Sequence, residues 1–83
     1  MVQHVVEFIV EPFVDGHPGP HVRAAVDAAT EAGAEVEFGP FGSTGRVDAE
    51  SMPDVVAAIT RAAFANGATF VTLNISSGES GSE

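Results

Sequence analysis

Gly39-Pro40-Phe41-Gly42-Ser43-Thr44 stands at the middle of the 83-residue chain, between two short runs whose patterns predict strands. The ring of Pro40 fixes φ at about −65°, and Gly39 and Gly42 can take positive φ without a Cβ clash. This composition predicts a tight reversal that joins the two strands as a hairpin. A hairpin in this position constrains the arrangement of every other element.

Hydrophobic periodicity predicts the remaining elements. Residues 4–11 alternate, with Val6, Phe8 and Val10 on one face, which is typical of a strand with one buried side. Residues 12–20 are rich in Pro and Gly and predict a loop. Further strands are expected over residues 35–38, with Val36 and Phe38 inward, and over residues 43–49 and 69–76.

Two helices are expected. The first begins near His21, carries small apolar residues at helical spacing and ends at Gly33, which suits a C-terminal cap. The second covers residues 51–66 and ends at Gly67, with Ser51 as its N-cap and Asp54 three residues later in a near capping box.

The order of elements is βαββαβ, which predicts an α+β, ferredoxin-like domain. Right-handed crossovers place both helices on one face of a four-stranded antiparallel sheet, with the first and third strands central. We expect one domain over residues 1–76 and a disordered polar tail over residues 77–83, which contains only Ser, Gly and Glu.

The sheet face without helices is the main functional indication. Alternation places on it Val5, Glu7, Ile9, Glu11, Glu35, Glu37, Thr44, Arg46, Phe70, Thr72 and Asn74. An apolar patch of Val5, Ile9 and Phe70 is unfavourable in water. The simplest cover is a second copy of the chain, which would enclose polar groups in a lined pocket.

Composition excludes several classes of function. Twelve acidic residues face three arginines and no lysine, giving a net charge of −9, so nucleic acid and anionic membranes are unfavourable partners. The chain has no cysteine and no apolar run long enough to cross a membrane. We expect a cytoplasmic protein. The acidity favours a high-salt, halophilic cytoplasm over the alternative, a GC-rich genome.

Candidate ligand-binding residues fall into two sets. Glu7 and Glu37 could hold a cation or an amino group, although Glu7 could instead simply pair with Arg46. Hydroxyls and an amide form the second set, namely Ser43, Thr44, Thr72 and Asn74, although hydroxyls after a turn often bond the local backbone.

Metal binding and catalysis lack a recognisable pattern. His17 and His21 are separated by Pro18-Gly19-Pro20, so helical ligand spacing does not apply, and Asp15 is the single obvious further ligand. The sequence contains no nucleophile with an adjacent base and no phosphate-binding glycine motif. We therefore expect neither a metal nor a cofactor.

The whole chain resembles the small thiamine-binding proteins of the YkoF-like superfamily. Three segments carry the resemblance: Val6-Glu7-Phe8-Ile9-Val10-Glu11-Pro12 with its loop, Gly39-Pro40-Phe41-Gly42-Ser43, and Ala62-Ala63-Phe64-Ala65-Asn66-Gly67-Ala68. Ser43 stands where relatives usually carry Thr, and Arg46 where they often carry Glu. The resemblance implies a ferredoxin-like subunit that forms homodimers or homotetramers and binds thiamine, or its pyrimidine part, without converting it.

Under this interpretation an aminopyrimidine stacks on Phe41 or Phe70 beside Gly42. Ser43 and Thr44 would bond the ring, and Glu37 or Glu7 would favour its cation. The alternative is a small enzyme of the dimeric α+β-barrel type with a pocket between sheet and helices. A purely structural partner subunit is a third possibility.

Overall fold

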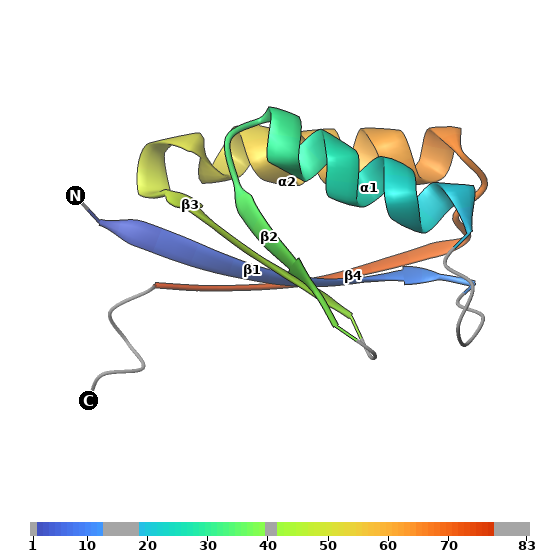
Figure 1. Cartoon of the computed structure of the whole chain (residues 1–83), viewed down its shortest axis with the longest axis horizontal. Helices are drawn as coiled ribbons and strands as arrows, with labels where there is room; N and C mark the ends of the chain where they lie inside the picture. Colours follow the sequence, from blue (N-terminus) through green and yellow to red (C-terminus); the bar gives the residue numbers. More distant parts are fainter. Residues whose placement is uncertain (1, 13–18, 40–41, 78–83) are drawn as a thin grey trace.

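The computed structural model describes residues 2–12, 19–39 and 42–77. A single antiparallel sheet lies on one side and two helices lie side by side on the other (Figure 1). The elements are the strands β1 (Gln3–Glu11), β2 (Glu35–Phe38), β3 (Ser43–Asp48) and β4 (Phe70–Ser77), the helices α1 (Pro20–Glu31) and α2 (Met52–Ala65), and the short 3-10 turn η1 (Ala49–Ser51).

The strand order is β2-β3-β1-β4, with all neighbours antiparallel. This is the predicted ferredoxin-like βαββαβ arrangement, with the first and third strands central. The backbone N–H of Gly39 donates to the carbonyl of Gly42 over 2.7 Å, which closes the hairpin between β2 and β3. In the part of the chain that the structure describes, no helix is long and apolar enough to cross a membrane.

The core lies between the sheet and the helices, as the alternation predicts. Val6, Phe8 and Val10 of β1 are at most 4% exposed. Among residues 2–12, 19–39 and 42–77, the buried apolar residues are Val6, Phe8, Val10, Val22, Ala25, Ala29, Ala34, Val47, Met52, Val55, Ile59 and Ala63. Alanines on the inner stripes of both helices let them approach the sheet and each other closely.

The ends of both helices confirm the glycines that the sequence predicted there. Gly33 and Gly67 follow α1 and α2 with φ of 110° and 103°, a region that other residues rarely adopt. Ser51 occupies the N-cap position of α2, as predicted, but it also closes η1 in a helical conformation and makes no side-chain capping bond. The near capping box with Asp54 therefore does not form.

Three further details differ from the sequence-based expectation. Pro20 is the first residue of α1 rather than the end of the loop, which suits a residue with no N–H to donate. Ser77 belongs to β4 rather than to the tail, and residues 78–83 lie outside the described residues. Phe38 has its side chain on the helix side of the sheet, but it is 49% exposed because β2 is an edge strand.

Candidate functional site

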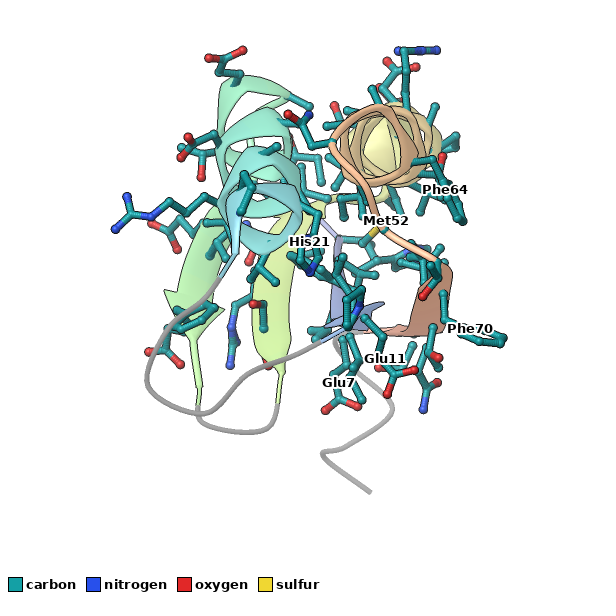
Figure 2. The ribbon with its side chains drawn as sticks, turned by 90° about the vertical axis from the view of Figure 1, so that its right-hand side faces the viewer. Glu7, Glu11, His21, Met52, Phe64 and Phe70 are labelled. Atoms are coloured by element: carbon teal, nitrogen blue, oxygen red, sulfur yellow. The ribbon has the colours of Figure 1, made fainter. Side chains whose placement is uncertain are left out.

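The face of the sheet opposite to the helices, called here the open face, is uncovered by any other described element. Figure 2 shows Glu7 and Glu11 projecting from this side, and Phe70 projecting from the margin of β4. Ile9 is 40% exposed and Phe70 is 67% exposed, although both are large apolar residues. The predicted division of β1 into a buried face and an open face is therefore confirmed, whereas the helix-side residues of β4 are only half-buried or exposed.

Strand register brings four of the predicted residues into one row across the open face. Glu7 lies opposite Thr44 on β3 and opposite Asn74 on β4. Thr44 lies opposite Glu37 on β2. The row, called here the acidic row, is Glu37–Thr44–Glu7–Asn74. Adjacent strands are about 4.8 Å apart. Along the row, the Thr44 hydroxyl lies between the carboxylates of Glu37 and Glu7, and the Asn74 amide follows Glu7.

Arg46 lies in the next row, on the same face. Its neighbours across the strands are Glu35 and Val5, whereas Glu7 is only a diagonal neighbour. Directly opposed side chains are closest in an antiparallel pair. The register therefore makes Glu35 the nearest acidic neighbour of Arg46 across the strands, an arrangement that the sequence reasoning, which considered Glu7 as its possible partner, did not include. In the sequence, Glu35 and Arg46 are equally far from the midpoint between Pro40 and Phe41, and this was the signal that could have revealed it.

Ile9 and Phe70 lie on the side of the acidic row nearer the β2–β3 hairpin, as diagonal neighbours, whereas Val5 of the predicted apolar patch lies on the other side of the row. Ile9 lies opposite Thr72, and Glu11 lies opposite Phe70. A Cβ placed on Gly42 would come within 3.1 Å of Ile9 Cγ1 and 3.2 Å of the Phe8 carbonyl oxygen. Glycine at position 42 thus allows the hairpin to close against Ile9, which keeps that side chain in place on the open face.

Not all predicted site residues meet on this face. Ser43 lies opposite Phe8, has its side chain on the helix side and is 3% exposed. Ser43 and Thr44 therefore point to opposite sides of the sheet and cannot contact one ligand on the open face together. Phe41, predicted as a stacking partner, lies outside the described residues, as do His17 and Asp15.

The open face carries an excess of negative charge. By strand alternation it holds the carboxylates of Glu7, Glu11, Glu35, Glu37 and Asp48 against the single guanidinium of Arg46. A surface of this kind favours a cation or an amine over an anion. A small depression of about 200 Å³ lies elsewhere, on the helix side, where Arg23, Val26, Asp27 and Phe38 line it.

His21 makes a contact that the sequence did not indicate. At the start of α1, its Nε2 is hydrogen-bonded to the carbonyl oxygen of Pro12, directly after β1. This bond ties the first turn of α1 to the end of the strand that carries Glu7 and Ile9. His21 therefore has a structural partner in the fold.

Comparisons with known proteins identify the fold. No protein-family model matches the chain, and no curated protein is similar to it. Among solved structures, a domain of unknown function, DUF77, from Bacillus cereus is 24% identical with a TM-score of 0.63, covering 89% of this chain and 72% of that one. A hypothetical protein from Methanocaldococcus jannaschii is 18% identical with a TM-score of 0.62, covering 93% and 79%.

A third similar structure carries a functional name. It is the "putative thiamine biosynthesis/salvage protein" from Thermotoga maritima, 23% identical with a TM-score of 0.52, covering 89% of this chain and 80% of that one. At these identities the likeness concerns the fold alone. The chain therefore has the ferredoxin-like α+β fold of these small proteins, in agreement with the resemblance drawn from its sequence.

Proposed function

We propose that the protein binds a small heterocyclic cation or amine, such as thiamine or its aminopyrimidine part, and releases it unchanged. The ligand would lie on the open face, between two copies of the chain in a homo-oligomer. One observation carries the proposal, namely the acidic row Glu37–Thr44–Glu7–Asn74 on a sheet face that no other described element covers.

The chemistry of the row suits an aminopyrimidine. A carboxylate accepts hydrogen bonds from an exocyclic amine and stabilises a positive charge, while a hydroxyl and an amide can each donate to or accept from ring nitrogens. Glu7 has a hydroxyl on one side and an amide on the other, so a planar ligand above it could meet all three groups. Ile9, next to the row, offers an apolar surface for the ring.

Arg46 is compatible with a cationic ligand because of its register. Glu35 lies directly opposite it and supplies a local countercharge. The carboxylates of Glu7 and Glu37 then retain their negative potential toward the ligand. The name of the Thermotoga maritima structure, which refers to thiamine biosynthesis or salvage, supports thiamine as the first ligand to test.

A second copy would supply the enclosure that a single sheet face lacks. Ile9 and Phe70 are large apolar side chains in a protein of only 83 residues, and a symmetric partner would remove both from water. Two acidic faces repel each other when they meet. A bound cation at the seam would offset that repulsion, so assembly and ligand binding should strengthen one another.

Isothermal titration calorimetry with thiamine tests the proposal. Thiamine, its aminopyrimidine alcohol and a neutral heterocycle of similar size are titrated into the wild type and into Glu7→Gln, and the ligand is recovered afterwards by chromatography. We expect saturable binding of the first two, weakened in Glu7→Gln, with the ligand recovered intact. Conversion of the ligand would favour the enzyme alternative, and no saturable heat for any of them would refute the proposal.

A further inference from the structure

The outer edge of β4 lacks the features by which proteins protect an edge strand. Within the described part of the chain β4 pairs with β1 alone, so backbone groups of alternate residues face away from the sheet. The strand Phe70–Ser77 has eight residues, FVTLNISS, without a charge or a proline. Long, uncharged edge strands of this kind readily pair with another strand.

The opposite edge of the same sheet provides an internal comparison. β2 is also an edge strand, but it has only four residues, EVEF, and two of them are glutamates. Shortness and charge are the usual protection of an exposed edge. The edge strand β2 is thus short and charged, whereas β4 carries neither form of protection, although the net charge of −9 shows that acidic residues are abundant.

The helix layer also stops short of β4. On the helix side of the sheet, Phe8 of β1 is 1% exposed, whereas Ile75 of β4 is 46% exposed. Leu73 of β4, which lies directly opposite Phe8, is half-buried. Phe64 of α2, 53% exposed, points to the same side of the molecule as Phe70 (Figure 2). The outer margin along residues 70–76 of β4 is therefore apolar, and no further strand of the described chain pairs with it.

We infer that β4 pairs antiparallel with β4 of a second copy, so that two protomers share one continuous eight-stranded sheet. A two-fold axis perpendicular to the sheet keeps the helices of both copies on the same face, so only residues of the same face can oppose one another. With the axis at Leu73, Val71 opposes Ile75 on the helix side. On the open face, Thr72 opposes Asn74.

This register is self-complementary, which favours a second copy over a different partner. Val71 and Ile75 form an apolar pair that covers the exposed part of Ile75, and Thr72 and Asn74 form a polar pair. Because the strand carries no charge, joining two copies here brings no carboxylates of β4 together. The edge of β4 is thus suited to self-association in a protein of net charge −9.

Edge pairing is independent of the ligand proposed above. It uses the outer edge of β4, whereas the ligand would use the open face, and Asn74 is the one residue of the acidic row that belongs to both. The two open faces would lie next to each other in one plane, and the second copy would bring its Thr72 and Asn74 beside the end of the acidic row. If two copies pair through β4 and two such pairs also meet through their open faces, the assembly is a tetramer. Loss of the β4 interface alone then leaves a dimer held by the open faces.

A pair of lysine variants tests the edge. Ile75→Lys places a charge on the exposed margin of β4, and Phe38→Lys places one at a site of similar exposure on β2, which serves as the matched control. Mass is measured by sedimentation velocity at about 1 M KCl, where the Debye length is about 3 Å. We expect the mass of Ile75→Lys to fall to half that of the wild type, with Phe38→Lys unchanged and circular dichroism native in both.

Cross-linking tests the register without relying on a destabilising charge. The chain has no cysteine, so Leu73→Cys introduces a single thiol at the proposed axis, and Phe38→Cys is its control. Opposed residues of an antiparallel pair have Cα atoms about 4.5–5.5 Å apart, within the range of a disulfide. We expect mild oxidation to give a covalent dimer of Leu73→Cys well above the level for Phe38→Cys. Equal cross-linking of the two, or an Ile75→Lys variant with wild-type mass, would overturn the inference.

Discussion

Replacing Ile9 by alanine removes an apolar side chain from the middle of the open face and leaves the rest of the fold in place. Ile9 is 40% exposed in one protomer and touches the turn at Gly42. Its truncation should lower the stability of the protomer by about 1 kcal/mol, the usual size for a partly buried residue. The larger effect is expected on self-association.

The size of that effect follows from the exposed fraction. Burying a whole isoleucine side chain contributes about 1.5–3 kcal/mol. The exposed 40% of Ile9 accounts for roughly 0.6–1.2 kcal/mol in each protomer, and a symmetric interface contains it twice. The loss of about 1.2–2.4 kcal/mol corresponds to an association weakened by roughly 7- to 50-fold. This is an upper range, because it assumes that the interface buries Ile9 completely.

The assay is sedimentation equilibrium over a range of protein concentrations at high salt, with urea unfolding as a check on the fold. Phe38→Ala is the control, because Phe38 is similarly exposed but lies on the other face of the sheet. We expect Ile9→Ala to dissociate at higher concentration than the wild type and Phe38→Ala to behave as the wild type. Equal association of all three proteins would show that no second copy covers the open face.

Four further variants and one change of buffer test separate parts of the account. Phe8→Ala should lower the free energy of unfolding by about 3–5 kcal/mol, measured in urea, because Phe8 is 1% exposed in the core. Gly67→Ala should cost about 1–2 kcal/mol in the same assay, from backbone strain alone, since φ is 103° and no atom lies within 4 Å of the added Cβ; an unchanged midpoint would refute this. Thr44→Ala should weaken thiamine about fivefold in calorimetry, whereas Ser43→Ala should leave the affinity unchanged, and a reversed order would move the ligand to the helix side. Raising KCl from about 0.1 M to about 1 M should tighten association in the absence of ligand, because salt screens the acidic open faces; weaker association would contradict it.

The sequence predicted the fold because its local patterns agree with one another. Strict alternation in β1 separates Val6 and Phe8 from Glu7 and Ile9, and a sheet has only two faces to which these sets can belong. Gly33 and Gly67 end the helices because the chain must adopt positive φ there. These are local requirements, and a sequence displays local requirements directly.

The cap at Ser51 illustrates where local reasoning failed. Ser51 has the right chemistry and spacing for an N-cap, but the chain enters α2 through η1, which already gives that residue a helical conformation. An N-cap side chain bonds the helix from an extended conformation. The entry path depends on how β3 ends against the helix layer, which the residues around Ser51 do not specify.

The sequence predicted which residues lie on the open face, but not how they are arranged on it. Alternation alone placed Glu7, Thr44 and Asn74 on the open face, and the structure aligns them in one row. Adjacent residues of a strand point to opposite faces, so Ser43 and Thr44 could not act together once β3 began at Ser43. Which residue lies opposite Arg46 on β2 depended on the register of the β2–β3 hairpin, which the side-chain pattern alone did not specify.

A titration of thiamine into the ¹⁵N-labelled protein, followed by the movement of its amide resonances, tests the central claim most directly. The account predicts saturable shifts concentrated at Glu7, Thr44 and Asn74, with Val55 and Ile59 of the buried face of α2 unaffected. Shifts concentrated on the helices, or the absence of any saturable shift, would contradict a ligand site on the open face.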